Sequence, residues 1–382
     1  MSTRSIETKD FKRVLIVGGG LAGLGLAGFL YEQGVEPVVV EKAEEWRRVG
    51  YGIGLWQDGI QVLERLGVID VATEVGTRPT ELQARGTDGD LLANARFGDP
   101  DTVPFVAIHR ADLHAALRES VPAEWIRMGT TPTSIDERPD EVLVTFDDGG
   151  REAFDLVVGT DGIGSTVREQ CFTDWSVNDC GTVAWSFWAP PEIEFPDATV
   201  SVWASGTEAF LTRVSGQGLV NVATTLPAER SAPPTRAQLK RTADRLGWLL
   251  PDLVNGLDPD ADLFFHRNRR VSADRWVTNR VCLIGDAAHA IHPISGTGAS
   301  LALEDAAVLA QEIATTTEEG LPTSLERYVA RRRNPVRRAQ REARIEAAIT
   351  FTESDMLVRL RGLLVEKTPL FEWFVRNQSA VF

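Results

Sequence analysis

The feature that most constrains the fold of this chain is a glycine turn near its start, set between a short apolar run and a helical segment. Residues 13–17 (RVLIV) lead into Gly18, Gly20 and Gly23, spaced as GxGxxG, after which leucine and alanine recur at helical intervals. A second apolar run then ends at Glu41. This order predicts a βαβ unit of a parallel sheet, whose turn lets the backbone approach a pyrophosphate closely. The helix N-terminus offers free N–H groups to the same anion.

Glu41 indicates which nucleotide the turn would hold. It lies 18 residues beyond Gly23, close to the interval of about 20 at which a carboxylate hydrogen-bonds a ribose. An acid at this position suits an unphosphorylated ribose, so NAD or FAD fits and NADP does not. The alternative is a glycine-rich turn without a ligand, but the flanking strand and helix and the acid together favour the nucleotide.

A second informative segment lies late in the chain, at 285–306 (GDAAHAIHPISGTGASLALEDA). It follows the apolar run 281–284, and a proline and two glycines precede its amphipathic part. This order predicts a strand, a loop and a helix N-terminus. Asp286 would then stand at the strand end, where a carboxylate can accept hydrogen bonds from sugar hydroxyls. The alternative for it is an ordinary N-cap or turn aspartate.

The rest of the chain reads as two further regions. Alternating residues at 142–146, the turn 147–150 (DDGG) and a strand at 154–158 predict a hairpin that leads into GTDGIGSTVR. From about 181 to 270, strands rich in aromatic residues, a proline-rich patch at 227–234 and a helix at 236–248 predict a separate sheet layer. From Leu325 onward we expect helices, with breaks at Asn334-Pro335 and Thr368-Pro369. The final apolar residues would cover the core rather than touch a membrane.

Composition excludes several classes of function. The net charge of −15 argues against a nucleic-acid partner. No apolar run is long enough to cross a membrane, and the start of the chain lacks a signal peptide's apolar core, so we expect a cytoplasmic protein. The three cysteines have no zinc spacing, and we expect no metal. Of the 40 basic residues only five are lysine, which with the acidic excess indicates adaptation to a salty cytoplasm or a bias in base composition. The basic run at 327–344 is expected to be a solvated helix with ion pairs.

Three elements in fixed order, GGGLAG at 18–23, GTDGIGSTVR at 159–168 and GDAAHAIHP at 285–293, resemble the single-component FAD-dependent monooxygenases of the p-hydroxybenzoate hydroxylase type. The resemblance covers about residues 13–315. It implies an α/β fold in which a Rossmann-like FAD-binding domain carries an inserted mixed β-sheet substrate domain and C-terminal helices. The implied bounds are 10–75, 100–180 and 271–325 for the FAD-binding domain, 76–99 and 181–270 for the substrate domain, and 326–382 for the helical region.

The resemblance also implies a set of FAD-binding residues: Gly18, Gly20, Leu21, Ala22, Gly23, Glu41, Lys42, Arg47, Gly52, Arg110, Asp161, Asp286, Gly296, Gly298 and Ala299. Arg110 would lie near the FAD phosphates, and Asp161 in the loop used for flavin and pyridine-nucleotide contacts. The helix start at 296–298 would point N–H groups at the pyrimidine edge of the flavin, where a helix N-terminus favours the negative charge of the reduced ring.

Three residues depart from the pattern of the family. Ser300 stands where asparagine is frequent, Thr297 where glutamine is frequent, and Pro132 where a main-chain N–H commonly meets the adenine, although proline has no N–H to donate. His289 and His292 invite a catalytic role, but the family chemistry does not require a histidine there, and for each a structural role is favoured. His292 and Pro293 are the only catalytic candidates.

The function that the resemblance implies is NAD(P)H-dependent monooxygenation with O₂. Reduced flavin would carry oxygen as a C4a-hydroperoxide to an aromatic or isoprenoid-like small molecule, and the NAD(P)H would dock transiently because no second GxGxxG exists. The candidate pocket residues are Trp185, Phe187, Trp203 and Phe210, with plain sheet packing as the alternative. Hydroxylation, epoxidation and oxidative decarboxylation all stay open, as do the oligomeric state and the choice between NADH and NADPH.

The rival functions are an FAD-dependent prenyl-lipid reductase, a flavin halogenase and a non-catalytic binding protein. The reductase's Tyr-x-Trp-x-Phe pattern is incomplete, because Val183 stands at the tyrosine position. The halogenase motif Trp-x-Trp-x-Ile-Pro is absent. The intact glycines, Glu41 and Asp286 argue against a non-catalytic protein.

Overall fold

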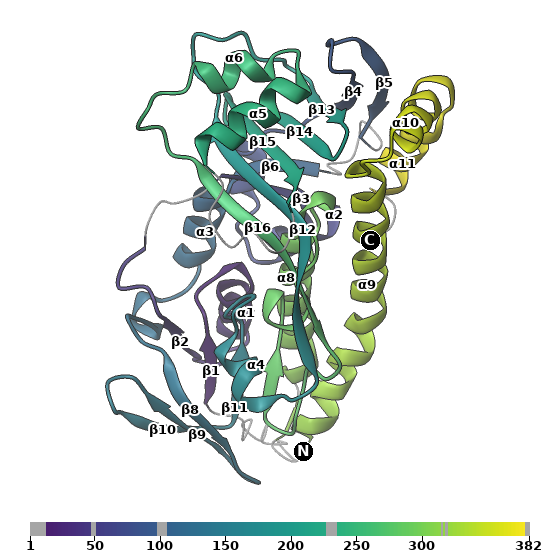
Figure 1. Cartoon of the computed structure of the whole chain (residues 1–382). Helices are drawn as coiled ribbons and strands as arrows, with labels where there is room; N and C mark the ends of the chain where they lie inside the picture. Colours follow the sequence, from purple (N-terminus) through teal and green to yellow (C-terminus); the bar gives the residue numbers. More distant parts are fainter. Residues whose placement is uncertain are drawn as a thin grey trace, which may run out of the picture.

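A computed structural model describes residues 13–46, 51–97, 105–226, 235–314, 316–317 and 320–378. The predicted FAD contact Arg47, the N-terminal segment and the proline-rich patch at 227–234 lie outside these residues. In the described part, a lower body built on a parallel sheet and an upper body built on a mixed sheet are spanned along one side by a long helix (Figure 1).

The lower body contains the βαβ unit predicted at the start of the chain. Its parallel sheet has the strand order β17-β11-β1-β2-β7. The strands are β1 (Val14–Val17), β2 (Val38–Glu41), β7 (Ile126–Met128), β11 (Leu156–Gly159) and β17 (Val281–Leu283). The side chains of β1 and β11 are all buried, which explains their continuous apolar sequences. The carboxyl ends of β1, β11 and β17, which are neighbours in the sheet, therefore bring the three sequence motifs to one edge.

Helices and two small sheets complete the lower body. The helices are α1 (Leu21–Glu32), α2 (Gln57–Arg65), α3 (Arg110–Glu119), α4 (Thr166–Cys171), α7 (Asp286–His289) and α8 (Gly298–Ile313), with short turns at Val71–Val75, Ala123–Trp125 and Pro293–Ser295. One small sheet pairs β3 (Gly52–Trp56) with β6 (Phe105–His109), and the other joins β8 (Pro132–Glu137), β9 (Val142–Phe146) and β10 (Arg151–Phe154). The hairpin turn predicted at 147–150 is confirmed between β9 and β10, whereas most of the strand predicted at 154–158 belongs to β11 of the parallel sheet. Pro132 is the first residue of β8, a position where its missing N–H removes no ladder bond from a strand interior.

The upper body is a seven-stranded mixed sheet of order β16-β12-β15-β14-β13-β4-β5. Its strands are β4 (Glu81–Arg85), β5 (Leu91–Arg96), β12 (Trp175–Trp188), β13 (Thr199–Ala204), β14 (Thr207–Val214), β15 (Gln217–Thr225) and β16 (Phe264–Ala273). The helices α5 (Arg236–Leu246) and α6 (Leu250–Asn255) pack on its outer face through one apolar cluster. The opposite face, here called the inner face, includes Ser186 and Asn221, since directly paired residues point to the same side.

The C-terminal part forms α9 (Leu321–Thr350), α10 (Asp355–Lys367) and α11 (Leu370–Gln378). The break expected at Thr368-Pro369 is confirmed, but the one at Asn334-Pro335 is wrong: α9 runs through Pro335 without interruption. Proline in a helix interior costs about 3 kcal/mol. Buried contacts on both sides of it, at Tyr328 and Val336, hold α9 against the lower body.

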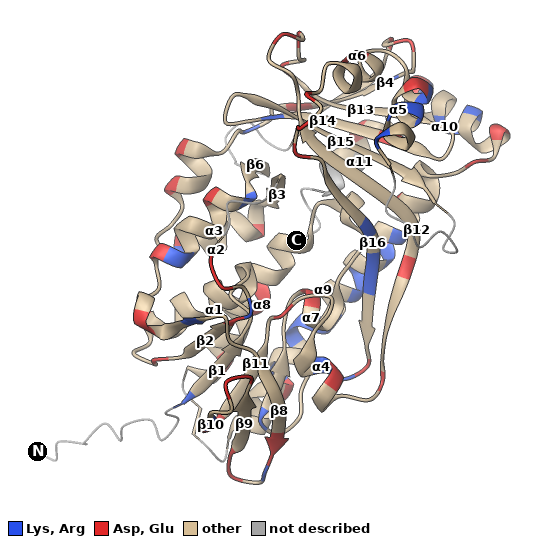
Figure 2. Ribbon diagram, turned by 60° about the vertical axis from the view of Figure 1, so that its left-hand side comes forward, with Lys and Arg blue, Asp and Glu red and all other residues tan. Residues whose placement is uncertain are grey.

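The final apolar stretch covers the core only in part. Val365, Phe371 and Val375 are buried against the upper sheet, whereas the leucines of α10 are exposed. Acidic residues are distributed over the ribbon of both bodies (Figure 2), in keeping with the net charge of −15. No helix of the described residues is long and apolar enough to cross a membrane.

Candidate active site

The glycine turn between β1 and α1 leaves an open space in front of a helix N-terminus. Gly18 has a φ of 110°, which favours glycine. A Cβ on Gly23 would lie 2.0 Å from the Gly18 carbonyl oxygen, so only glycine fits there. A Cβ on Gly20, by contrast, would meet no atom within 4 Å, and no side chain caps α1. The first-turn N–H groups of α1, near Leu21 and Ala22, are therefore available to an anion.

Glu41 is held in place by two backbone amides at the end of β2. Its Oε2 accepts from the Gly19 amide at 2.9 Å and its Oε1 from the Ala43 amide at 3.0 Å. Each oxygen keeps a second lone pair for a ribose hydroxyl. Sequence reasoning missed His114, whose Nε2 lies 2.8 Å from the Gly19 carbonyl oxygen and whose ring lies 4.7 Å from that of Trp46. Desolvation lowers the pKa of His114, which favours a neutral ring that donates to this carbonyl.

Arg110 and Asp286 provide opposite charges near each other. Arg110 begins α3, and its amide donates to the Tyr51 carbonyl at 3.0 Å. Among the described carboxylates none forms an ion pair with its guanidinium. The Asp286 side chain is open to solvent, yet the surrounding protein desolvates it enough to raise the pKa of its carboxyl, an effect that His289 and Arg110 oppose. This carboxylate is thus accessible to a ligand although protein surrounds it.

The middle and late motifs are joined by a residue that sequence reasoning did not single out. Arg168 is 2% exposed, and its guanidinium donates to the carbonyl oxygens of Ala287 at 2.8 Å and Ile163 at 2.6 Å. Asp161 caps α4, because its Oδ2 accepts from the amides of Thr166 at 2.7 Å and Val167 at 3.3 Å. The loop with Asp161 thus supports the segment that carries Asp286.

A buried charge network holds the late motif from the side of α8. Asp305 is fully buried; its Oδ2 accepts from the Gly285 amide at 2.9 Å and lies 2.5 Å from His289 Nε2, and its Oδ1 accepts from Arg332 Nε at 2.6 Å. Burial raises the pKa of Asp305, but His289 and Arg332 outweigh it and bring the value to about 2. His289 therefore has a structural role. The pattern LALEDA contains Asp305, but nothing in the sequence distinguishes it from an exposed helical acid.

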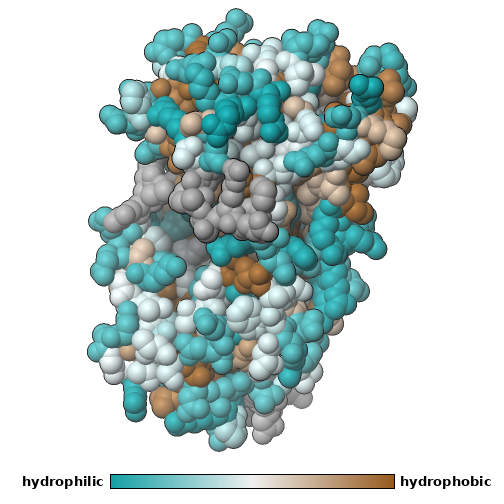
Figure 3. All heavy atoms as spheres, viewed as in Figure 1, coloured by the Kyte–Doolittle hydropathy of each residue, from teal (hydrophilic) through white to brown (hydrophobic). Residues whose placement is uncertain are grey.

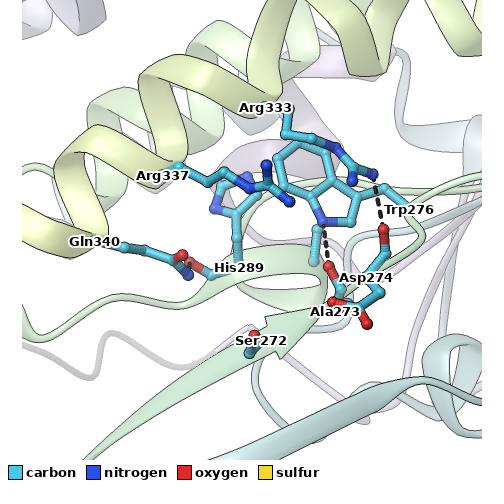
Figure 4. Close-up of a pocket in the computed structure, with 9 residues that line it drawn as sticks. Ser272, Ala273, Asp274, Trp276, His289, Arg333, Arg337 and Gln340 are labelled. Carbon is cyan, nitrogen blue, oxygen red and sulfur yellow. Dashed lines mark hydrogen bonds between the residues drawn. The ribbon is translucent and has the colours of Figure 1, made fainter.

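His289 also faces a small pocket on the side of α9 (Figure 4). Trp276, Arg333, Arg337 and Gln340 line this pocket with it. None of the predicted FAD contacts is among its lining residues.

His292 is a structural link rather than a base. Its Nδ1 accepts from the Ile294 amide at 3.2 Å, and its Nε2 lies 2.8 Å from Thr182 Oγ1 on β12. Desolvation lowers the pKa of His292 to about 4, so the ring is neutral near pH 7. Pro293 is exposed beside it.

The residues around the start of α8 explain two departures from the family pattern. Ser300 Oγ accepts from the Trp56 amide at 3.0 Å and so ties α8 to β3. Thr297 Oγ1 lies 2.9 Å from Ser295 Oγ within the same turn. Gly296 has a φ of 62°, and Gly298 and Ala299 remain partly exposed.

Two further predicted FAD contacts, Lys42 and Gly52, have unlike surroundings. Lys42 is exposed beside Glu41. A Cβ on Gly52 would lie 2.5 Å from Leu219 Cδ2, so this glycine permits close packing of β3 on β15.

The inner face of the upper sheet carries a polar pair beside aromatic rings. Asn221 Nδ2 donates to Ser186 Oγ at 2.8 Å, and Asn221 pairs across the strands with the predicted pocket residue Phe210. The Tyr51 ring lies 4.6 Å from that of Phe264, which pairs with Ser186 across β16 and β12.

Two of the other three predicted pocket residues face away from this polar pair. Trp185 and Phe187 are 2% exposed and belong to the apolar cluster under α5 and α6, because strand alternation points them away from Ser186. Trp203 lies on the inner face, because it pairs with Glu208 across β13 and β14; it donates to Glu208 at 2.9 Å and packs on Phe371 of α11. Trp185 and Phe187 thus follow the alternative of plain sheet packing, whereas a pocket role for Trp203 and Phe210 stays a prediction.

The family described as an FAD binding domain matches residues 12–343. The chain belongs to this family of FAD-dependent monooxygenases. A 2-heptyl-3-hydroxy-4(1H)-quinolone synthase of Pseudomonas aeruginosa is 32% identical, over 78% of this chain and 80% of that protein. A 3-amino-4-hydroxybenzoate 2-monooxygenase of Streptomyces platensis is 30% identical over 87% of each chain, and a 6-hydroxynicotinate 3-monooxygenase of Pseudomonas fluorescens is 29% identical over 78% and 82%.

The fold of the family is equally clear from solved structures. Klebsiella pneumoniae HpxO, complexed with FAD and uric acid, superposes with a TM-score of 0.87 over 99% of this chain and 98% of that one, at 24% identity. FAD as cofactor, monooxygenation and the Rossmann-like fold, each expected from the three motifs, are thereby confirmed.

Proposed function

We propose that this monooxygenase uses NAD(P)H and O₂ to hydroxylate an uncharged, electron-rich aromatic ring, in preference to an aromatic carboxylate. The hydrogen-bonded pair Ser186 and Asn221 on the inner face carries the proposal. Because Asn221 Nδ2 donates to Ser186 Oγ, the pair retains a hydroxyl donor on Ser186 and an amide-oxygen acceptor on Asn221. One donor beside one acceptor suits a neutral ring that bears an oxygen and an N–H or O–H.

The charges around this pair support a neutral substrate. The neighbouring inner-face positions on the described β12, β14 and β15 carry no lysine or arginine; they are Ala184, Trp188, Thr212, Glu208, Leu219 and Ala223. Glu208 is the one acid among them, and burial raises its pKa. These strand positions offer a substrate carboxylate no cationic partner, and burial of an unpaired charge is costly. The cations that act on the surrounding side chains are Arg361, beside Glu208, and Arg110, near Tyr51. Among the relatives, the quinolone synthase is named for an uncharged ring product and the other two for aromatic carboxylates, and we place this chain with the first.

The cofactor would be held by residues of the first and last motifs together with Glu41 and Arg110. The N-terminus of α1 and Arg110 fit a diphosphate, and Glu41 and Asp286 fit sugar hydroxyls. When bound, FAD supplies the electron and oxygen-transfer chemistry. We further propose that the α8 start at 296–299 stabilises negative charge on the ring through its N–H groups. The domain bounds given above remain part of this proposal.

The chain's own side chains position the substrate and exclude water. Burial raises the pKa of Tyr51, so its phenol stays protonated and can donate to a substrate oxygen. The rings of Tyr51, Phe264 and His266 make one apolar wall beside the polar pair. Such a wall limits the entry of water, which would let the reduced cofactor be reoxidised without forming hydroxylated product.

A matched substrate panel tests the proposal. Hydroxylated quinolones and pyridones are compared with the corresponding ring carboxylates for their ability to accelerate NAD(P)H oxidation and yield a hydroxylated product. We expect the neutral rings to have a kcat/KM at least tenfold higher, and Asn221→Ala to remove most of that preference. A preference for the carboxylates, or an Asn221→Ala variant with unchanged selectivity, would overturn the assignment of substrate class while leaving FAD binding intact.

A further inference from the structure

The helix α10 carries apolar side chains on two sides, and the rest of the molecule covers only one of them. Val365 is buried on its inward side, and Arg361 there donates to the Thr350 carbonyl at 2.6 Å. The outward side carries a second set of large apolar side chains, which we call the α10 stripe: Met356, Leu357, Leu360, Leu363 and Leu364, between 38% and 73% exposed. An ordinary surface helix buries its single apolar face, so the α10 stripe is an additional face.

The exposed apolar surface continues onto the end of α9. Ile345 and Ile349, one helical turn apart, are 54% and 53% exposed. Arg361 also donates to the Ile349 carbonyl at 3.1 Å, which places the middle of α10 beside this turn. Brown side chains gather in this region on the side of the upper body (Figure 3).

The combined surface is large for a monomer. Seven such side chains, each roughly half exposed, present about 600–800 Å² of largely apolar area, whereas the largest patch on a typical monomer is about 300–600 Å². A standard protein interface buries about 800 Å² on each partner. The α10 stripe with Ile345 and Ile349 therefore matches one side of an interface between two proteins.

The charges around the stripe decide between a membrane and a protein as its partner. The exposed acids beside this surface, Glu353, Asp355 and Glu366, are matched in number by the exposed cations Arg344, Arg359 and Lys367. The chain as a whole carries −15. Amphipathic helices that lie on membranes carry lysine and arginine on their polar face, which anionic lipids attract. This helix lacks that excess, so an anionic lipid surface is disfavoured.

We propose that the α10 stripe is the contact of a two-fold symmetric homodimer. Met356, Leu360 and Leu363 are spaced by four and three residues, the repeat of a helix-pair seam. In an antiparallel pair centred between Leu360 and Leu363, the turn of Asp355 on one copy lies beside the turn of Lys367 on the other. This arrangement pairs opposite charges and aligns the two helix dipoles head to tail. An isologous contact of this kind closes at two copies.

Light scattering coupled to size exclusion, performed on the full chain loaded with FAD, tests the dimer. We expect twice the mass of one chain at about 10 µM, a concentration suited to an interface of standard size. The double variant Leu360→Glu/Leu363→Glu should have the mass of one chain, because we expect its dimer dissociation constant to be at least 100-fold higher. Val75→Glu, an equally polar change at a residue 40% exposed on the lower body, should leave the dimer intact.

Two further readouts keep the result interpretable. An unchanged flavin spectrum and circular dichroism in the double variant show that it folds, so that its mass reports on the contact alone. A wild-type mass of one chain at about 100 µM, or a double variant that stays dimeric, overturns the proposal. Flotation of a monomeric wild type with phosphatidylcholine vesicles, lost in the double variant, would overturn it in favour of a lipid partner.

Discussion

Replacement of Asp305 by asparagine tests whether a buried hydrogen-bond network holds the segment 285–293 in place. Both oxygens of Asp305 accept from N–H donors: the Gly285 amide and His289 on one side, and Arg332 on the other. An asparagine must turn its NH₂ group toward one of these donors whichever way it is oriented. The variant also removes one of the carboxylate partners of Arg332, a residue that is 5% exposed and that keeps its ion pair with Glu304.

The structure gives the size of the effect. A fall in the pKa of Asp305 from 3.8 to about 2 corresponds to about 2.5 kcal/mol of stability. Removal of one partner from a buried ion pair costs about 3–5 kcal/mol. We therefore expect Asp305→Asn to lower the free energy of unfolding by about 2–4 kcal/mol. Because the folded pKa is depressed, this contribution is fully present above about pH 4 and is lost as the pH falls toward 2.

Urea unfolding of the FAD-free protein measures the change, and flavin fluorescence quenching measures FAD affinity. We expect the stability difference to be constant between about pH 5 and 8. FAD should bind about tenfold more weakly, because the segment with Asp286 loses its anchor. Glu342→Gln is the matched control: its ion pair with Arg338 is exposed, so the loss should stay below about 0.5 kcal/mol. A loss for Asp305→Asn as small as for this control would refute the reasoning.

Three further substitutions probe the cofactor seat and the proton chemistry. Gly23→Ala should abolish FAD binding, because its Cβ would lie 2.0 Å from the Gly18 oxygen; Gly164→Ala, whose Cβ meets nothing within 4 Å, should bind FAD normally, and equal titration curves for the two would contradict this. Arg110→Gln should weaken FAD about 10- to 100-fold by loss of a charged hydrogen bond to phosphate, measured by the same titration; a change under threefold speaks against a phosphate contact. His292→Asn should keep kcat within about tenfold and leave its pH profile unmoved between about pH 6 and 9, since a pKa of about 4 makes the ring neutral there; a lost limb of the profile would restore a role as a base.

The sequence predicted what depends on short spacings. The βαβ unit, the hairpin at β9 and β10 and the strand before Asp286 all follow from local periodicity and turn residues. The meeting of the three motifs at one sheet edge was seen only in the structure, although it follows the rule that ligands bind at the carboxyl ends of parallel strands.

Contacts between distant segments could not be predicted in the same way. Arg168 bonds Ala287, 119 residues away, and Asn221 bonds Ser186, 35 residues away. In the sequence, Trp185 and Ser186 are neighbours on one aromatic strand, and the face that each occupies depends on where α5 and α6 dock. Pro335 shows the same limit, since tertiary packing outweighed its local preference to end a helix.

Labelled oxygen tests the central claim most directly. The purified, FAD-loaded enzyme turns over a neutral aromatic substrate with NAD(P)H under ¹⁸O₂, and the product is analysed by mass spectrometry. We predict one ¹⁸O atom in the hydroxylated product and none when the label is supplied as water. Product without label, or complete recovery of the consumed NAD(P)H as hydrogen peroxide across the substrate panel, would contradict the assignment of this site as a monooxygenase of neutral aromatic rings.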